Sequence, residues 1–483
     1  MGRLSTGIKG LDKVLYGGFL KQKAYLISGG PGAGKTTFCL HFLEEGSRKG
    51  ENCLFISLGE REKQIRENAK DLGLKLKKVY FLDLSPSSDY FVNLESYDIF
   101  SPAEVEKEPV ANAIKEAVES YKPKRVVIDS LTQFRYLATD VFQFRKEVLS
   151  LLRYLADNGA TVVFTSEASQ ETPDDDLRFL SDGVIDLFVG EDYRYLVVRK
   201  FRGSEFLSGT HTYEIKTGKG VVVYPRLHFE SVQPTFGNFE KLSFGVPEID
   251  ELLYGGIERS TVSIVAGPSG TGKTTLCMQF LKEASGRGER SVLYTFEEAP
   301  AKIINRCEQV NIPAKHMVEK GTLEIVYVPP NIYTADAFAE MVKEDVEKNK
   351  TQIVMIDSTS GYDEAIIGKK NLPYLFNLCK YLSLNGVTVL LPTEVKNITG
   401  DFVISNYDIS YVADNILFLR YIEVKGQLRR TIGVLKKRLS NFEKTLREFE
   451  ITQYGIKVGE PLRNLENILT GTPRLIDEKE QRS

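Results

Sequence analysis

The stretch GGPGAGKTTFCLHFL runs from Gly29 to Leu43, and the stretch GPSGTGKTTLCMQFL runs from Gly267 to Leu281. Nine of the fifteen aligned positions are identical, and each stretch contains the pattern G-x-x-x-x-G-K-[ST]. Glycines at these positions let backbone N–H groups converge on phosphate oxygens, while the Lys reaches the terminal phosphates and the hydroxyl ligates Mg²⁺. A single match could be a chance glycine-rich turn. Two matches, each between a strand pattern and a helix pattern, predict two nucleotide sites, formed by Gly32, Gly34, Lys35, Thr36 and Thr37 and by Gly270, Gly272, Lys273, Thr274 and Thr275.

The repeat extends far beyond these loops. Tyr16-Gly17-Gly18 is matched by Tyr254-Gly255-Gly256, and RVVIDS at 125–130 is matched by IVMIDS at 353–358. The chain has 483 residues, whereas a single core stops growing at about 250–300 residues. We therefore expect a first domain over residues 1–235, a second over 236–462 and a short tail over 463–483.

Each half alternates strand-sized apolar runs with helical patterns. In the first half, KAYLISGG precedes the glycine-rich loop, TTFCLHFLEEGSRKG has helical periodicity, and CLFISL is the next strand. The second half repeats this order, and each half ends in two neighbouring strands. The pattern predicts an α/β fold in which each domain has a mostly parallel, twisted sheet flanked by helices.

The composition is that of an ordinary globular protein, with 42% hydrophobic and 27% charged residues. A net charge of -3 argues against a dedicated nucleic-acid binder, and the apolar runs are far shorter than the ~18 residues of a membrane helix. The five cysteines do not have metal-ligand spacing, and their odd number does not suggest a disulfide framework. The N-terminus lacks the apolar core of a secretory signal, so we expect a cytoplasmic protein with no membrane or nucleic-acid partner.

Two aspartates directly follow apolar runs. Asp129 ends RVVID and Asp357 ends IVMID. An acidic residue at the tip of a buried strand suits a second Mg²⁺ anchor, so we predict metal sites formed by Thr36 with Asp129 and by Thr274 with Asp357. The alternative is that each Asp only caps the next turn.

Phosphoryl transfer also needs a residue that orients the group attacking the phosphate. We expect it at the end of the strand that follows the helix after each glycine-rich phosphate-binding loop, or P-loop. The second half has Glu297 and Glu298 there, whereas the first half has Gly59 and Glu60. We take all three glutamates as catalytic candidates. If the first Glu of the pair is the general base, its loss predicts that the second half carries most of the chemistry. The alternative is a solvated turn.

Each half also ends in a Lys-x-Arg pair. Two-residue alternation predicts that Lys200 and Arg202 share a face with Leu196 and Val198, and that Lys436 and Arg438 share a face with Ile432 and Val434. Duplicated cations could stabilise the charge of a phosphoryl transition state. The alternative is a solvated strand end.

The entry segments TGIKGLD and GVPEIDELLYGG, the two P-loops, TFEE, the IDS strands and the terminal K-x-R-x-S together resemble the KaiC family. These are the two-domain RecA-like ATPases of circadian clock systems, and the resemblance covers about Leu4 to Ile476. It implies two tandem RecA-like P-loop domains, a homohexameric double ring, and ATP with Mg²⁺ bound between neighbouring subunits. It further implies that a neighbour's nucleotide is contacted by Lys200, Arg202, Ser204, Lys436, Arg438 and Ser440.

The resemblance also implies phosphate transfer to an adjacent Ser-Thr pair in a segment like HISTITD. The matching stretch here is DISYVAD, in which Ser410 keeps the serine and Tyr411 replaces the threonine. Leu439 replaces the glycine usually found between the Arg and the Ser, and the tail is short. Serine autophosphorylation at Ser410 is therefore an expectation, but a two-site cycle and a working clock are not.

The leading hypothesis is a ring-forming regulatory ATPase that signals to other proteins. A RecA-type DNA-dependent ATPase shares the same core, and DNA-stimulated, salt-sensitive ATP hydrolysis would favour it. A nucleotide-gated scaffold with little turnover is the third hypothesis. It would assemble with ATP without releasing phosphate.

Overall fold

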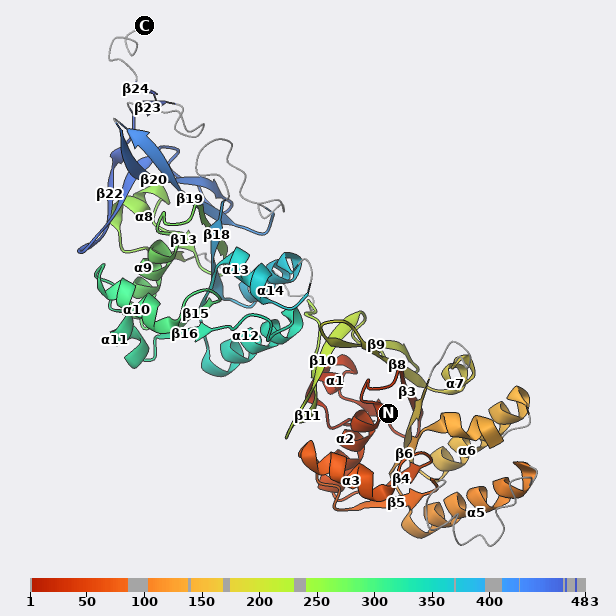
Figure 1. The fold of residues 1–483 in the computed structure, drawn as a ribbon. Helices are drawn as coiled ribbons and strands as arrows, with labels where there is room; N and C mark the ends of the chain where they lie inside the picture. Colours follow the sequence, from red (N-terminus) through yellow and green to blue (C-terminus); the bar gives the residue numbers. More distant parts are fainter. Residues whose placement is uncertain are drawn as a thin grey trace. The chain divides into compact units, whose positions relative to one another are not determined.

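The computed structural model describes residues 2–85, 103–137, 140–167, 174–229, 240–368, 371–395, 411–424, 426–463, 465–466 and 474–475. The chain divides into two compact units, Met1–His228 and Phe229–Ser483, each drawn in Figure 1. No helix among the described residues is both long enough and apolar enough to span a bilayer.

The first unit has the following elements in chain order: β1 (Arg3–Leu4), α1 (Lys9–Val14), β2 (Phe19–Leu20), β3 (Ala24–Gly29), α2 (Lys35–Arg48), β4 (Cys53–Ser57), α3 (Glu62–Asp71), β5 (Val79–Asp83), α5 (Ala103–Tyr121), β6 (Arg125–Asp129), the 3₁₀ helix η1 (Leu131–Leu137), α6 (Val141–Asp157), β7 (Thr161–Ser166), α7 (Asp175–Leu180), β8 (Gly183–Val189), β9 (Arg194–Phe201), β10 (Thr210–Lys216) and β11 (Gly220–Tyr224).

These strands form a nine-stranded sheet in the order β11-β10-β9-β8-β3-β7-β6-β4-β5, in addition to the small β1–β2 pair. The run from β8 to β5 is parallel, and β9, β10 and β11 are added antiparallel at one edge. The expectation of a mostly parallel sheet is confirmed, as is the pairing of the two neighbouring strands, β8 with β9.

Strand alternation divides the apolar residues between two layers. Tyr25 and Ile27 of β3 face a core that also contains side chains of α1, α2 and α3. Leu26 faces the opposite core, built with α5 and α6. Figure 1 shows these helices covering the sheet. Both faces of the central strands are buried, which is why they read as continuous apolar runs.

The second unit has these elements: β12 (Lys241–Leu242), α8 (Pro247–Leu252), β13 (Ile257–Glu258), β14 (Val262–Gly267), α9 (Lys273–Gly286), β15 (Ser291–Thr295), α10 (Pro300–Glu308), α11 (Ala314–Glu319), β16 (Leu323–Tyr327), α12 (Ala335–Asn349), β17 (Ile353–Asp357), α13 (Thr359–Ala365), α14 (Leu372–Leu384), β18 (Thr388–Glu394), β19 (Asn415–Val424), β20 (Gln427–Lys437), β21 (Arg447–Thr452), β22 (Gly455–Pro461), β23 (Leu465–Glu466) and β24 (Arg474–Leu475).

Its main sheet has the order β16-β15-β17-β18-β14-β19-β20-β21-β22, the same arrangement as in the first unit. Again the P-loop strand, β14, lies between two parallel neighbours, β18 and β19. Antiparallel strands β20, β21 and β22 extend one edge. The duplication in sequence is therefore a duplication of fold.

The predicted faces of the cationic strands were wrong, because both strands contain a β-bulge. Val184 pairs with Lys200 but Ile185 pairs with Val198, which leaves Arg199 as the extra residue. Leu435 is extra in the same way in β20. A bulge reverses the alternation beyond it. Hence Phe201 is buried like Leu196 and Val198, whereas Lys200 lies on the other face.

Candidate active site

Both P-loops join a central strand to a helix through a glycine in the left-handed region. Gly34 has φ +85° and precedes α2, while Gly272 has φ +102° and precedes α9. A Cβ on Gly34 would lie 2.5 Å from Cδ1 of Ile215, and one on Gly272 would lie 2.4 Å from Cδ1 of Ile451. Backbone conformation and lack of space thus both select glycine here.

The P-loop lysines fold back over their own loops. Nζ of Lys35 donates to the carbonyl oxygens of Gly29 at 2.9 Å and Gly30 at 3.1 Å, and Nζ of Lys273 donates to Pro268 O at 2.9 Å. Burial lowers the pKa of Lys273, although the Glu394 and Asp357 carboxylates oppose the shift. An anionic phosphate would supply the counter-charge that these ammonium groups lack on the loop.

The predicted metal-binding pairs are in contact. Oγ1 of Thr36 donates to Oδ2 of Asp129 at 2.6 Å, and Oγ1 of Thr274 donates to Oδ2 of Asp357 at 2.7 Å. Thr165 also donates to Asp129. A hydroxyl beside a carboxylate is a donor set that suits a hard cation sharing its remaining sites with phosphate and water. Among the described residues no group of three His, Cys, Asp or Glu forms a separate metal cage.

Strand register explains why these side chains meet. Asp129 ends β6 and is aligned with Ser57 at the end of β4, and β7 separates β6 from the P-loop strand β3. The carboxyl ends of all these parallel strands lie side by side at the same end of the sheet, which is where α/β proteins bind ligands.

The first domain has a cavity of about 350 Å³ at this edge, which we term the first nucleotide cavity. Gly32, Lys35 and Thr36 line it from the P-loop, together with Glu60. Burial, and secondarily the Asp129 carboxylate, raise the pKa of Glu60. Its full lining is Pro31, Gly32, Gly34, Lys35, Thr36, Ser57, Gly59, Glu60, Asp129, Ser130, Gln133 and Glu167.

In the second domain the two glutamates have different partners. Oε1 of Glu297 accepts from Oγ of Ser358 at 3.1 Å, whereas Glu298 forms an ion pair with Arg306 at 2.7 Å. Burial raises the pKa of Asp357 to about 6, and the Glu297 carboxylate contributes to this rise. Glu297 therefore lies beside the Thr274–Asp357 pair, while Glu298 is directed to α10.

The two threonines that follow the predicted metal-binding threonines lie in the first turns of α2 and α9. Thr37 is half-buried and Thr275 is buried.

The cationic arms lie away from the P-loop of their own domain. We use this term for Lys200, Arg202 and Ser204 and for Lys436, Arg438 and Ser440. Lys200 is aligned with Val184 near the amino end of β8, which runs parallel to β3. The first arm therefore lies at the amino-terminal ends of the parallel strands, whereas the first nucleotide cavity lies at their carboxyl-terminal ends. Lys436, aligned with Ile416 near the start of β19, has the same position in the second sheet.

Several contacts hold the arms in place. Nζ of Lys200 donates to Arg178 O at 2.8 Å, and Arg3 donates to the hydroxyl of Ser204. In the second arm, Arg438 donates to Tyr411 O at 2.7 Å and Ser440 donates to Oε1 of Glu258 at 2.8 Å. Burial, and then the neighbouring arginine, lower the pKa of both Lys200 and Lys436. Ser410 itself lies outside the described residues.

Sequence reasoning missed two acidic residues. Glu167 follows β7 and lines the first nucleotide cavity. Glu394 ends β18, aligned with Gly267 of the second P-loop. The available signal was an acid after each of the apolar runs ATVVFTS and VTVLLPT, the same pattern that identified Asp129 and Asp357.

Two P-loops at the carboxyl edges of parallel sheets, each with a Thr–Asp pair and neighbouring acidic groups, define a tandem P-loop protein with the RecA-like fold. The family model for the KaiC ATPase matches residues 4–228 and 242–463. The chain therefore belongs to the KaiC family of ATPases, and ATP is the nucleotide that this family binds.

Among its relatives is the circadian clock protein KaiC3 of a Synechocystis strain, which is 29% identical over 98% of this chain and 94% of the relative. The circadian clock oscillator protein KaiC of Parasynechococcus marenigrum is 30% identical, covering 99% of this chain and 94% of the relative. The KaiC of Synechococcus elongatus is 28% identical, covering 100% and 94%. The similarity thus extends over both domains.

Proposed function

We propose that this KaiC-family chain is a Mg²⁺-dependent regulatory ATPase in which both domains bind ATP and the second performs most of the hydrolysis. The observation that carries this proposal is the position of Glu297, held by Ser358 beside the Thr274–Asp357 pair. At the matching position the first domain has Gly59, so among the described residues that line its cavity only Glu60 and Glu167 supply carboxylates besides Asp129, the proposed metal ligand.

Each group has a distinct task in this proposal. Backbone N–H groups of the P-loop and Lys273 hold the phosphates, and Glu297 orients and deprotonates the attacking water. Mg²⁺, held by Thr274 and Asp357, would neutralise charge on the β- and γ-phosphate oxygens.

The test is steady-state phosphate release by matched variants of the full chain. Glu297→Gln should lower turnover by about 10²-fold or more in the second domain, leaving the slow contribution of the first. Glu60→Gln should change the total little. In a Lys273→Ala background, Gly59→Glu should raise the remaining turnover. If Lys273→Ala leaves total turnover unchanged while Lys35→Ala abolishes it, the assignment is wrong.

We further propose that ATP is shared between neighbouring chains in a ring, with six copies expected for the family. The support is topological, since each cationic arm lies at the amino-terminal ends of the parallel strands and its own P-loop lies at their carboxyl-terminal ends. A head-to-tail contact that closes on itself brings the arm of one copy to the nucleotide of the next.

Mixing experiments test this shared site. Chains carrying Lys273→Ala retain the arm but lack the P-loop lysine, and chains carrying Arg438→Ala have the reverse defect. Mixed and reassembled with ATP, they should recover part of the turnover that neither shows alone. Coassembly without any recovery would contradict a shared site.

Serine autokinase activity at Ser410 belongs to the same proposal. The residue after it, Tyr411, accepts a hydrogen bond from Arg438 at 2.7 Å, so the arm contacts the residue adjacent to this serine in the chain. After incubation with ATP and Mg²⁺, the intact mass should increase by one phosphate that maps to Ser410 and is lost in Glu297→Gln. Phosphate release with an unchanged protein mass would support the proposed ATPase activity and contradict the proposed autokinase activity.

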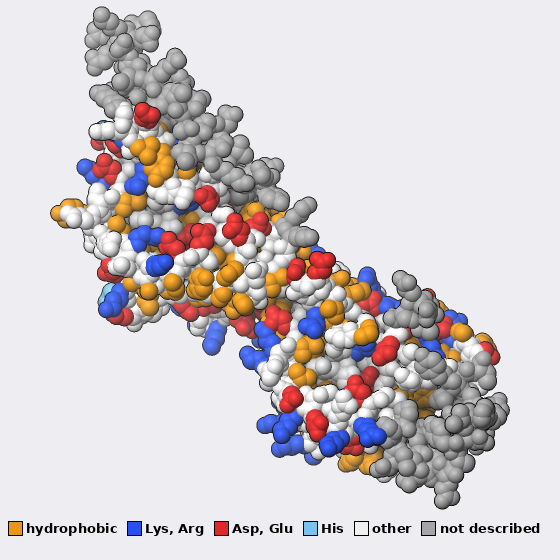
Figure 2. All heavy atoms as spheres, in the orientation of Figure 1, with side chains coloured by type: hydrophobic (Ala, Val, Ile, Leu, Met, Phe, Trp, Pro, Cys, Tyr) orange, Lys and Arg blue, Asp and Glu red, His pale blue; other side chains and the backbone are white. Residues whose placement is uncertain are grey.

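A DNA-dependent activity has less support. Figure 2 shows Lys and Arg side chains interspersed with Asp and Glu over both units on the face drawn. The added charge of a phosphoserine at an interface, about -1.5 to -2, would instead suit regulation of contacts with other proteins.

A further inference from the structure

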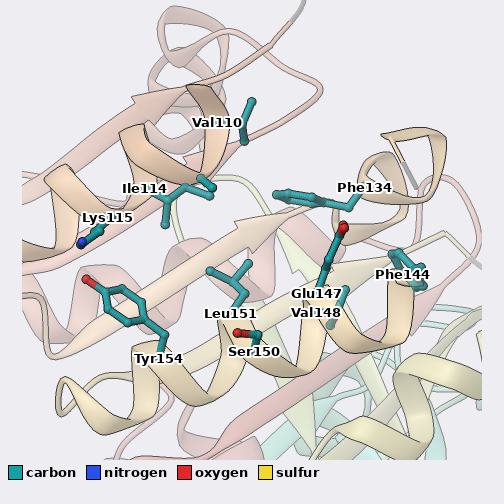
Figure 3. A pocket seen from close by; sticks show the side chains of 11 residues that line it. Val110, Ile114, Lys115, Phe134, Phe144, Glu147, Val148, Ser150, Leu151 and Tyr154 are labelled. Atoms are coloured by element: carbon teal, nitrogen blue, oxygen red, sulfur yellow. The ribbon is translucent and has the colours of Figure 1, made fainter. Parts of the chain in front are cut away.

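The first domain contains a second cavity, of about 460 Å³, on the face of the sheet covered by α5 and α6. Figure 3 shows its lining, contributed by α5, η1 and α6. The walls are mainly apolar, and we call it the helix cavity. Its lining residues are Val110, Ala111, Ile114, Lys115, Phe134, Phe144, Glu147, Val148, Ser150, Leu151 and Tyr154.

Comparison of the two domains explains why this space is open. With the offset of 228 residues that relates Asp129 to Asp357, Val110 corresponds to Phe338 and Phe134 corresponds to Tyr362. Phe338 and Tyr362 are buried against each other with ring centroids 5.4 Å apart, and Phe296 packs on both.

The first domain has smaller side chains at most of these positions. Leu58 corresponds to Phe296 and Ile56 to Tyr294, with the offset of 238 residues that relates the P-loops. Phe134 is only partly buried. Of these smaller side chains, Val110 lines the helix cavity, so the absence of a Phe ring at this position leaves space beside it.

The charged groups of the helix cavity and the Tyr154 hydroxyl lie toward its ends, with Ser150 between them (Figure 3). Figure 3 shows the Lys115 ammonium and the Tyr154 hydroxyl at one end, and the Glu147 carboxylate near Phe134 at the other. Tyr154 Oη is buried and has no hydrogen-bond partner among the described residues. Lys115 lies 3.9 Å from Oε1 of Glu119, and Glu147 accepts from Nε2 of Gln143 at 2.8 Å.

A buried hydroxyl without a partner in a mainly apolar cavity is unfavourable, since buried polar groups are nearly always hydrogen-bonded. A ligand oxygen beside Tyr154 would satisfy it. Lys115 lies at the same end, and its contact with Glu119, 3.9 Å long between two exposed side chains, is a weak ion pair, so a ligand carboxylate can compete with Glu119 for the ammonium. The volume is within the range of about 300–1,000 Å³ that small-molecule sites occupy.

We propose that the helix cavity binds a small molecule with an aromatic or branched apolar body and one carboxylate, whose oxygen accepts from the Tyr154 hydroxyl beside Lys115. Binding at this site requires neither ATP nor the proposed hydrolysis. We expect the site in the first domain and not in the second, because the second has Phe338 where the first has Val110.

The test uses 4-phenylbutyrate as the probe, titrated against the nucleotide-free full chain by calorimetry and by saturation-transfer NMR. We expect saturable binding to one site, with Kd near ~1 mM for a ligand of this size. The charge-reversed analogue 4-phenylbutylamine should bind about fivefold more weakly, because its ammonium has no acceptor for the Tyr154 hydroxyl and cannot pair with Lys115.

Matched variants locate the site. Val110→Phe introduces the side chain that the second domain has at this position, and it should remove binding. Ala111→Trp, at an exposed position lining the cavity, should do the same, whereas Asn112→Trp on the next exposed position of α5 should not. Tyr154→Phe should weaken 4-phenylbutyrate about fivefold.

Circular dichroism and thermal unfolding of each variant establish that it is folded. Absence of saturable binding to the wild-type chain would overturn the proposal. Unchanged affinity in both Val110→Phe and Ala111→Trp would overturn it too, because the probe would then bind elsewhere.

Discussion

Gln133 and Phe134 are consecutive residues of η1, yet Gln133 lines the first nucleotide cavity and Phe134 lines the helix cavity. η1 begins two residues after Asp129, the proposed metal-binding carboxylate. One short helix therefore separates the two sites, and a shift of this helix would change the lining of both cavities.

This relationship predicts coupling between the two ligands. With the second domain silenced by Lys273→Ala, saturating 4-phenylbutyrate should tighten ATP binding to the first domain about fivefold, because it restrains η1. Thermodynamic reciprocity requires ATP to tighten 4-phenylbutyrate equally. Titrations of each ligand with and without the other measure this, and Gln133→Ala should weaken the coupling while the probe still binds. Independent binding would show that η1 does not transmit between the sites.

The P-loop glycines differ in their tolerance of a side chain. Gly34→Ala places a Cβ 2.5 Å from Cδ1 of Ile215 at a left-handed φ, a conformation that costs a non-glycine residue about 1–2 kcal/mol. The loop must move to relieve this, so ATP affinity of the first domain should fall about tenfold or more.

Gly30→Ala is the control, since a Cβ at this position would meet no atom within 4 Å and the φ of Gly30 is not in the left-handed region. Fluorescent ATP analogue binding to chains carrying Lys273→Ala compares the two. Equal affinities would mean that the loop adapts without strain.

Acid should destabilise the first domain through His41. Nε2 of the buried His41 accepts from the Val221 N–H at 2.8 Å, and burial lowers its pKa to about 4 from 6.5. As the pH falls, the unfolded chain therefore binds this proton at a higher pH than the folded chain does. Stability is full above pH 6.5, and about 3 kcal/mol is lost as the pH falls to 4.

His41→Gln supplies the control, because the second domain has Gln279 at this position. The variant should retain the acceptor for Val221 but lose this part of the acid sensitivity. Hydrogen exchange of the Val221 amide at pH 7 and pH 5 measures the local stability, after correction for intrinsic exchange. The same acid response in both chains would exclude His41 as the cause.

The second domain contains a buried ion pair. Nζ of Lys437 donates to Leu253 O at 2.6 Å and lies 3.1 Å from Oε1 of Glu258, and both side chains are almost fully buried. Glu258→Gln leaves the ammonium without its counter-charge, so it should destabilise the second domain by about 3–5 kcal/mol.

The double variant Glu258→Gln/Lys437→Met should recover most of this loss, because the buried charge is removed. Urea unfolding followed by hydrogen exchange assigns the change to the second domain. If the double variant is as unstable as the single, the hydrogen bond from Lys437 to Leu253 O, which Lys437→Met removes, would be the larger contribution.

Much of the site was predictable because its residues occur in short sequence motifs. A glycine-rich loop and an Asp after an apolar run each need only a few consecutive residues, and parallel strands bring them together. The faces of Lys200 and Lys436 were not predictable, since a bulge depends on how β9 pairs with β8 and β20 with β19. Glu167 and Glu394 were missed although the same strand-end signal was present.

By itself, then, the sequence determined the duplication, the α/β class, the two P-loops and their Thr–Asp partners, because each follows from spacing and short-range periodicity. Only the tertiary structure decided the direction of the cationic arms and their distance along the sheet from their own P-loops. It also decided that Val110 borders a cavity, whereas Phe338 at the matching position is buried against Tyr362. Volume is a property of side chains that meet from separate elements, and no single segment of the chain contains it.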